Sequence, residues 1–253
     1  MMSKVFIVTG ASRGLGLAIT QTLLKESHKV FLVARSEEKL QELKSQNPGS
    51  VDFLTADLGG DYQVASKITT ATVKAFGQID GLVVNHGTLS PVIKICDSDV
   101  EEWRKAYDVN VFSALALVKE AIPELRKSEG RVIFVSSGAS TSAYQGWGAY
   151  GTSKAALNHL CSHLAIEEEA ITTLCISPGK VDTDMQKQVR NEGLSGMRSD
   201  IHAGFVQEYE SGRLLDPNVP GGVIARLTVA APKSLNGKHW RWNAEELKEF
   251  QSS

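Results

Sequence analysis

A short apolar run near the N-terminus leads directly into a glycine-rich turn. The run Val5–Thr9 has the composition of a buried strand, and Gly10, Gly14 and Gly16 follow it ahead of an amphipathic stretch. The first glycine permits a tight turn, and the later two let the backbone approach a pyrophosphate and let a helix pack closely on its sheet. The helix N-terminus then offers free N–H groups to phosphate. Three glycines alone are a weak signal, but between a strand and a helix they predict a dinucleotide-binding α/β fold.

The rest of the chain alternates between short apolar runs and longer amphipathic stretches. The runs consist mostly of Val, Ile, Leu and Phe without polar alternation, which is typical of parallel strands covered on both faces. Right-handed crossovers between them predict one Rossmann-type, doubly wound parallel sheet of about seven strands, with helices on both faces, over residues 1–253. We expect strands at Val5–Thr9, Val30–Ala34, Val51–Ala56, Gly81–Asn85, Arg131–Ser136, Thr173–Ser177 and His239–Trp242, and helices at Leu15–Glu26, Glu37–Ser45, Asp61–Phe76, Glu101–Lys127 and Tyr150–Glu169.

Composition limits the partners and the compartment. The net charge is −2 and no basic run occurs, which argues against nucleic acid or an anionic membrane as a main partner. Cys96, Cys161 and Cys175 are widely spaced and form no zinc-binding pattern, which suits a reducing compartment and predicts no metal site. The first apolar run is too short for a signal peptide or a membrane span. We expect a cytoplasmic protein that could also reach the nucleus.

The segment 184–213 interrupts this alternation. It is polar, contains four glycines at Gly193, Gly196, Gly204 and Gly212, and follows the end of an expected strand. Ligands of such sheets bind beyond the carboxyl ends of the strands, so a mobile substrate lid is one interpretation. An ordinary surface excursion is the other.

The residues after the second expected strand bear on the choice of dinucleotide. NAD binders usually place a carboxylate there, whereas this strand is followed by Arg35 and Ser36, with no acid before Glu37. A guanidinium matches a phosphate bidentately, and Arg13 in the glycine turn could reach the same phosphate. We therefore expect NADP(H), although arginines at two such positions could also be ordinary surface residues.

Tyr150 and Lys154 are four residues apart in an expected helix, so they share one face. An ammonium beside a phenol favours the phenolate and lowers the pKa of the phenol toward neutrality, which would let Tyr150 exchange protons at physiological pH. An isolated pair of this kind is usually a solvated face with a packed ring. The interpretation gains weight from the glycine turn and from Ser137 upstream.

Taken together, these motifs resemble those of the short-chain dehydrogenase/reductase family over essentially the whole chain. The resemblance includes the glycine turn, Asp57, Asn85-His86-Gly87, Asn110, Ser137, Tyr150 with Lys154, and the run 178–183. Within the family the chain is most similar to fungal benzil (α-diketone) reductases, which are close to sepiapterin reductase, through the segments 134–140, 146–151, 153–159, 214–217 and 234–237. His86 departs from the family pattern, where a small residue is usual, and we expect its backbone to border the cofactor while its ring packs or meets solvent.

The resemblance implies a role for each member of the catalytic set. Tyr150 would be the general acid, and Ser137 would stabilise the developing oxyanion. Lys154 would hold the nicotinamide ribose, and Asn110 would hold a water that links Lys154 to solvent. The implied cofactor-binding set is Gly10, Ser12, Arg13, Gly14, Leu15, Gly16, Arg35, Ser36, Asp57, Leu58, Asn85, Gly87, Asn110, Tyr150, Lys154, Pro178, Gly179, Val181 and Thr183.

The resulting expectation is an NADPH-dependent carbonyl reductase that acts on a hydrophobic ketone or α-diketone. Ser137, Tyr144, Trp147 and Met185 are the candidate substrate contacts, and Phe205 and Tyr209 are further aromatic candidates that could equally be core residues. An alcohol dehydrogenase of the same family that works oxidatively is one alternative. A dinucleotide-sensing module without turnover is another. The resemblance also implies a homodimer or homotetramer.

Overall fold

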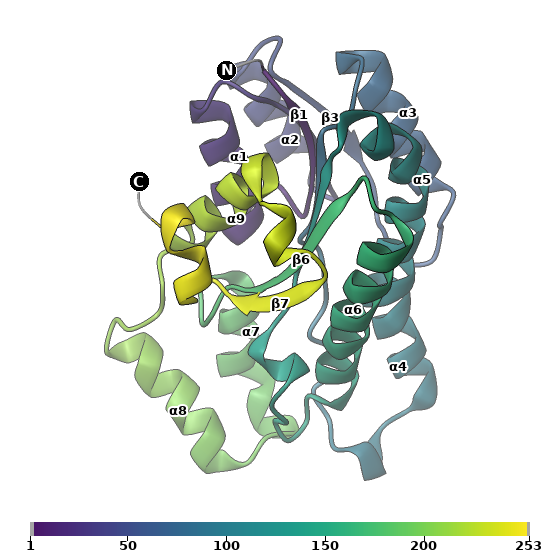
Figure 1. The fold of residues 1–253 in the computed structure, drawn as a ribbon. Helices are drawn as coiled ribbons and strands as arrows, with labels where there is room; N and C mark the ends of the chain where they lie inside the picture. Colours follow the sequence, from purple (N-terminus) through teal and green to yellow (C-terminus); the bar gives the residue numbers. More distant parts are fainter. Residues whose placement is uncertain (1–2, 252–253) are drawn as a thin grey trace.

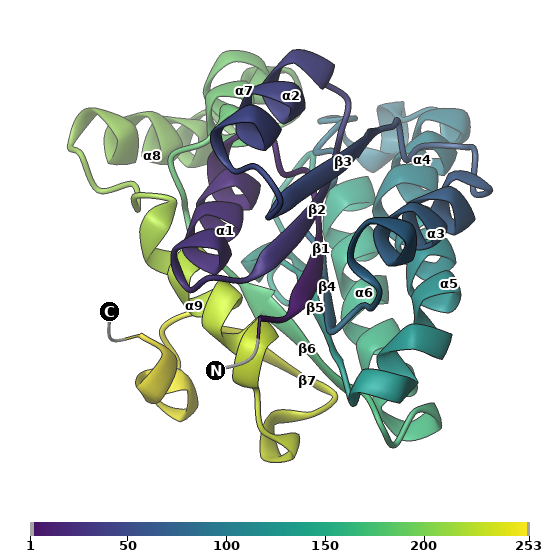
Figure 2. The same ribbon diagram turned by 90° about the horizontal axis from the view of Figure 1, so that it is seen from above.

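Seven parallel strands form one sheet in the computed structural model, which describes residues 3–251. The strand order is β3-β2-β1-β4-β5-β6-β7, so the predicted doubly wound fold is confirmed (Figures 1 and 2). The first two and last two residues of the expected 1–253 domain lie outside the described part. The strands are β1 (Val5–Thr9), β2 (Lys29–Ala34), β3 (Val51–Thr55), β4 (Gly81–Val84), β5 (Arg131–Val135), β6 (Thr172–Ser177) and β7 (Lys238–Arg241).

Helices cover both faces of this sheet. Successive strand residues point to opposite faces, so Phe6 and Val8 enter one core and Ile7 enters the other, all fully buried. The first core is closed by α1 (Gly14–Lys25), α2 (Glu37–Gln46) and α9 (Asn218–Ala230), and the second by α3 (Val64–Phe76), α5 (Ser113–Ser128) and α6 (Gly148–Glu167). Short 3₁₀ turns lie at Ile95–Asp97, Gly138–Ser140, Gly193–Ser195, Lys233–Leu235 and Glu245–Phe250.

The single helix expected over Glu101–Lys127 is wrong. The structure has α4 (Val100–Tyr107), a π-helical turn (Asp108–Phe112) and then α5. Asn110 lies in the π-helical turn and is buried, and its side chain is held by hydrogen bonds outside the helix. Isolated π turns inside helices occur frequently at functional sites, and this one carries a predicted catalytic residue.

Helix α9 has no counterpart among the helices expected from the sequence. Its residues are apolar on nearly every side, and most of them are buried, so it lacks the amphipathic pattern that marks a surface helix. It packs directly on α1. A Cβ atom at Gly221 would lie 2.9 Å from the Cβ of Ala18, so the glycine sets the close approach of the two helices.

The segment 184–213 is mostly helical. It forms α7 (Asp184–Glu192), a 3₁₀ turn and α8 (Ser199–Glu210). Figure 1 shows both helices below the sheet, on the side where the strands end. A third apolar cluster lies under them and contains Trp147, Tyr150 and Phe205. The polar sequence of this segment therefore reflects helices that each bury only a narrow face.

Candidate active site

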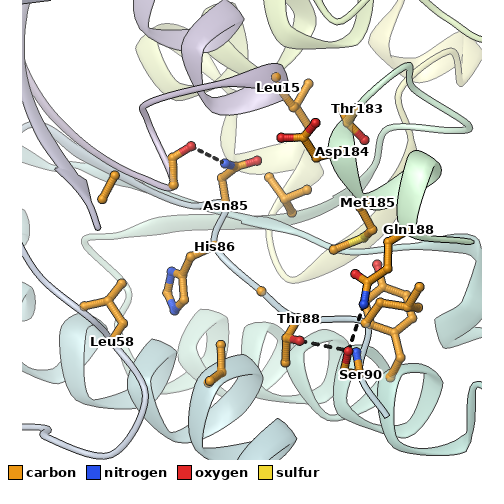
Figure 3. Close-up of a pocket in the computed structure, with 18 of the residues that line it drawn as sticks. Leu15, Leu58, Asn85, His86, Thr88, Ser90, Thr183, Asp184, Met185 and Gln188 are labelled. Carbon is orange, nitrogen blue, oxygen red and sulfur yellow. Dashed lines mark hydrogen bonds between the residues drawn. The ribbon is translucent and has the colours of Figure 1, made fainter. Parts of the chain in front are cut away.

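A cavity of about 1140 Å³ lies at the carboxyl ends of the strands. Its walls come from the glycine turn, from the residues that follow β2, β3, β4, β5 and β6, and from α7. Figure 3 shows one part of this wall, with Asn85 and His86 opposite Thr183 and Met185. Pockets for drug-sized ligands usually span about 300–1000 Å³, so this cavity has room for a ligand larger than that class, or for two ligands together.

The glycine turn has the geometry of a phosphate cradle. Gly10 and Gly14 have positive φ angles of 63° and 53°, which favour glycine. A Cβ atom on Gly16 would lie 2.2 Å from the carbonyl oxygen of Gly10, so no side chain fits there. The amide of Asn85 donates to the carbonyl oxygens of Thr9 and Gly10, at 3.0 and 3.3 Å. Asn85 therefore fixes the turn at the N-terminus of α1, where unpaired N–H groups favour anions.

Both arginines that the sequence singled out line the cavity. Arg35 is exposed and has no carboxylate within ion-pair distance among residues 3–251. Arg13 forms an exposed ion pair with Asp184 at 2.8 Å, which joins the glycine turn to the start of α7. Lys39, one helical turn after Arg35, also lines this end of the cavity. The end of the cavity next to β2 is therefore rich in positive charge.

Ser137, Tyr150 and Lys154 come together in the same cavity. Ser137 follows β5, and the other two residues share a face in the first turns of α6. The ammonium of Lys154 lies 5.8 Å from the centre of the Tyr150 ring and donates to the carbonyl oxygen of Val135 at 2.8 Å. The Tyr150 and Lys154 side chains are both buried. A phenol, an ammonium and a hydroxyl thus line one cavity.

The structure corrects the expected pKa of Tyr150. Burial raises the pKa of this phenol above its usual value, and a hydrogen bond with Ser137 only partly opposes the effect. Burial also lowers the pKa of Lys154 to about 8. The lowering of the Tyr150 pKa by Lys154 does not occur in this structure, because desolvation disfavours both charged forms and the ammonium is directed at Val135. Tyr150 is therefore a neutral phenol at physiological pH, which is the proton-donating form.

Asn110 joins the π-helical turn to the segment that follows β4. Its side-chain oxygen accepts from the N–H of Thr88 at 2.8 Å, and its amide donates to the Thr88 carbonyl oxygen and to the Ser153 hydroxyl, both at 2.9 Å. A Cβ atom at Gly87 would lie 3.1 Å from the Asn110 oxygen and 3.4 Å from the Lys154 ammonium. Asn110 and Lys154 are therefore close neighbours across Gly87.

The loop after β6 closes the other side of the cavity. Gly179 has a positive φ of 80°, and a Cβ atom at Gly14 would lie 3.1 Å from the methyl group of Thr183. The loop therefore lies against the glycine turn. Lys180 forms an ion pair with Glu208 of α8 at 2.6 Å, which connects this loop to the segment 184–213.

The chain matches the family model described as short chain dehydrogenase over residues 4–193. It belongs to the short chain dehydrogenase family.

Three comparisons with proteins of Saccharomyces cerevisiae extend this assignment to the full chain. A protein named benzil reductase ((S)-benzoin forming) is 41% identical, with 97% of this chain and 98% of the relative covered. The crystal structure of a short chain dehydrogenase/reductase is 40% identical with a TM-score of 0.96, covering 99% of this chain and 100% of the other. The crystal structure of a cytoplasmic protein of unknown function from the same yeast is 39% identical with a TM-score of 0.84, over 99% and 100% of the two chains.

A nicotinamide dinucleotide, the cofactor type of short chain dehydrogenases, fits the residues present. The glycine turn leaves space that a side chain would fill, and the cavity continues from this turn to Tyr150 and Ser137. All of the expected cofactor-binding residues line the cavity except Gly16, which acts through backbone packing, and Asn110, which lies behind Gly87. No three His, Cys, Asp or Glu side chains within residues 3–251 gather as a metal site, and no helix in this range is long and apolar enough to cross a membrane.

The expected substrate wall needs one correction. Trp147 and Met185 line the cavity, but Tyr144 does not. Its ring packs behind Trp147, at 5.0 Å between ring centres, and Phe205 supports Trp147 from the same side at 5.5 Å. Tyr209 is half exposed and stacks with Arg190. The aromatic residues other than Trp147 therefore buttress the wall and do not form it.

Other lining residues were not among the sequence candidates. Thr88, Ser90, Gln188 and Val189 form the wall opposite the glycine turn, where Gln188 donates to the Ser90 hydroxyl at 2.9 Å (Figure 3). Thr88 and Ser90 come shortly after the Asn85–Gly87 motif in the sequence, so both could have been predicted as lining residues by extending that motif. Gln188 carries no such signal, because only the fold brings α7 to this wall.

Proposed function

We propose that this short chain dehydrogenase is an NADPH-dependent carbonyl reductase whose substrates are hydrophobic ketones or α-diketones. One observation supports the proposal most strongly. Ser137, Tyr150 and Lys154 line the same cavity as the phosphate-binding glycine turn. Hydride transfer requires a proton donor beside the reactive carbon, and this arrangement supplies one.

We infer NADP(H) from the charge at the β2 end of the cavity. Arg35 is free of carboxylate partners among the described residues, and Arg13 could exchange its exposed pairing with Asp184 for a phosphate. An exposed ion pair of this kind contributes about 0–1 kcal/mol, so the exchange costs little. Asp57 and Leu58 lie on the neighbouring wall, where they would contact the adenine.

Each residue of the site has a separate role in the proposed reduction. The dinucleotide supplies the hydride when it is bound. Tyr150, kept as a neutral phenol by burial, gives its proton to the carbonyl oxygen as negative charge develops there, while the Ser137 hydroxyl donates to the same oxygen. Thr183, on the loop that contacts the glycine turn, would bind the carboxamide and fix the orientation of the nicotinamide.

Proton resupply would run through Lys154 and Asn110. Lys154 has a pKa of about 8, so it is mostly charged near pH 7 yet can release a proton. It would also hold the nicotinamide ribose. Both N–H groups of the Asn110 amide are already used, but its side-chain oxygen accepts only one of two possible hydrogen bonds. The remaining lone pair is available to a water that links Lys154 to solvent.

The wall around Trp147 supports an aryl or otherwise flat substrate. Trp147 stands edge-on to Tyr150, at 5.8 Å between ring centres, and Met185 lies on the same wall. The indole N–H of Trp147 is buried and has no hydrogen-bond partner among residues 3–251. A buried donor without a partner is costly, and the second oxygen of an α-diketone would satisfy it. Because one relative is named benzil reductase, benzil is the first substrate to test.

We propose also that α7 and α8 act as a lid over the substrate. Phe205 of α8 packs on Trp147, and polar pairs at the edges of the two helices, such as Lys180 with Glu208 and Gln188 with Ser90, join them to the body. Such pairs break readily. Hydrogen–deuterium exchange that slows in residues 184–213 when NADP⁺ and a diketone bind would support the lid, and unchanged exchange would refute it.

We propose also that the protein forms a homo-oligomer and is located in the cytoplasm. Phe112, at the end of the π-helical turn, and Leu115 of α5 are large apolar side chains that remain 44% and 45% exposed, which supports a homodimer or homotetramer through this part of the chain. Sedimentation equilibrium would show the assembly, and a monomer would contradict it. A cytoplasmic location is supported by the yeast relative described as cytoplasmic.

The decisive assay follows the loss of NADPH absorbance with benzil and a panel of simple ketones. Turnover with NADPH, faster than with NADH, is the expected result. Faster turnover of alcohols with NADP⁺ under the same conditions would favour the oxidative alternative. Binding of NADPH without turnover of any carbonyl or alcohol would indicate a sensor and overturn the proposal.

A further inference from the structure

His86 lies between two parts of the active site, with both ring nitrogens hydrogen-bonded. Its Nδ1 lies 2.8 Å from the Thr9 hydroxyl at the end of β1, and its Nε2 lies 2.7 Å from the Ser113 hydroxyl at the start of α5. Figure 3 shows the ring extending from the segment after β4 toward the helices below. The imidazole therefore bridges the strand that enters the glycine turn and the helix that leaves the π-helical turn.

The surrounding hydrogen bonds indicate which nitrogen carries the proton. The Ser113 hydroxyl donates to the carbonyl oxygen of Val109 at 2.6 Å, so it can only accept from His86. Nε2 is then the N–H donor, and Nδ1 accepts from the Thr9 hydroxyl, which lies 2.8 Å from Nδ1 and 3.1 Å from its alternative acceptor, the carbonyl oxygen of Val83. Burial also lowers the pKa of His86 to about 3, which keeps the ring neutral. With this tautomer both ring nitrogens are hydrogen-bonded, and the Thr9 hydroxyl donates to His86 in place of Val83.

The Ser113 hydroxyl connects His86 to the π-helical turn. Val109, its acceptor, directly precedes Asn110 within the turn. On the other side of Gly87, Thr88 binds Asn110 through both its backbone groups. The segment 85–88 is therefore attached to the glycine turn by Asn85, to β1 and α5 by His86, and to Asn110 by Thr88.

We propose that His86 is a positioning residue that holds the π-helical turn, and with it Asn110 and Lys154, in place relative to the glycine turn. A small side chain at this position could not make the bridge. His86 contacts no reacting atom in this scheme. It acts through Ser113 and Val109, and the inference rests on the proposed reductase function for its kinetic consequence.

The variants distinguish the effect of the two hydrogen bonds from the effect of losing a histidine ring. His86→Ala removes both hydrogen bonds of the ring, Ser113→Ala removes the Nε2 partner together with its hydrogen bond to Val109, and His86→Gln places an amide where Nε2 stood. His28→Ala is the control, because His28 is also hydrogen-bonded but is buried away from the cavity. Circular dichroism establishes that each variant folds, and Ser113→Ala still tests the bridge if His86→Ala does not fold.

The first readout does not depend on activity. We expect amide hydrogen exchange in residues 108–113 to be at least about tenfold faster in His86→Ala and in Ser113→Ala than in the parent, close to parent in His86→Gln, and unchanged in His28→Ala. Equal exchange in the parent and in both bridge variants would overturn the proposal, even if the parent reduced no carbonyl.

The second readout is kinetic, and it distinguishes misplaced catalytic groups from weaker binding of NADPH. Displacement of a catalytic group by about 1 Å can cost about 100-fold in rate, so we expect His86→Ala to lower kcat by about 10- to 100-fold while the Kd for NADPH changes by less than about threefold. The alkaline limb of the kcat–pH profile should also shift, because Lys154 would have moved. An unchanged kcat, or an equal loss in His28→Ala, would contradict the positioning role. If the parent itself reduces no carbonyl, the proposed function fails and the exchange result alone decides the role of His86.

Discussion

Burial determines the protonation of the two central residues of the site. Tyr150 and Lys154 are both buried, so the neutral form of each is favoured, and the pKa values move in opposite directions. A phenol that stays protonated suits reduction, since it has a proton to give. At this scale the four-residue spacing predicted the correct neighbours but the wrong direction for the pKa of Tyr150.

The depressed pKa of Lys154 makes stability depend on pH. The unfolded chain keeps this proton up to pH 10.5 whereas the folded protein loses it from about pH 8, so the unfolded state binds more protons between these values and stability rises with pH there. Relative to Lys154→Met, the parent should gain about 2 kcal/mol in free energy of unfolding between about pH 7 and pH 9.5. Tyr150 is present in both proteins and cancels. Urea unfolding of both proteins measures the difference, and a constant difference would contradict the buried charge.

Arg35 is the residue on which the cofactor preference depends most. Replacing it by Asp removes a charged hydrogen bond to the 2′-phosphate and repels the phosphate, so the ratio of kcat/KM for NADPH to that for NADH should fall by at least about tenfold. Arg213→Asp, an exposed arginine outside the cavity, is the control. An unaltered ratio in Arg35→Asp would mean that Arg13 or Lys39 recognises the phosphate.

At the scale of the elements, two features position the site. The π-helical turn between α4 and α5 presents Asn110, and the contact of α9 with α1 supports the helix whose N-terminus forms the phosphate cradle. Neither feature was predicted from the sequence. A π turn has no strong residue preference of its own, and an all-apolar helix such as α9 has no periodic pattern to detect.

Two glycines in helices test the α1–α9 contact. A Cβ atom at Gly221 of α9 would lie 2.9 Å from Ala18, whereas one at Gly204 of α8 would meet no atom within 4 Å. Gly221→Ala should therefore destabilise the protein by about 1–3 kcal/mol, while Gly204→Ala should stabilise it by about 0.5–1 kcal/mol through helix propensity. Thermal unfolding of the two variants compares them directly. Equal shifts of the same sign would show that the close helix contact does not limit stability.

For the whole molecule, the parallel sheet explains why the site could be largely anticipated. The carboxyl ends of parallel strands meet at one edge, so residues after β1, β4 and β5 were expected to converge, and Gly10, Asn85 and Ser137 do line one cavity. What the sequence could not give depends on packing between distant segments. Tyr144 lies behind Trp147, and Gln188 reaches Ser90, only because α7 and α8 fold over this edge.

The most direct test of the account is the Tyr150→Phe variant, assayed for both turnover and cofactor binding. Removing one hydroxyl leaves the ring packed against Trp147 and the glycine turn intact, so the Kd for NADPH should stay within about threefold of the parent value. Carbonyl reduction should fall by at least about 100-fold, in keeping with the loss of a general acid. Turnover near the parent rate, with binding unchanged, would show that the proton comes from another group and would contradict the proposed mechanism.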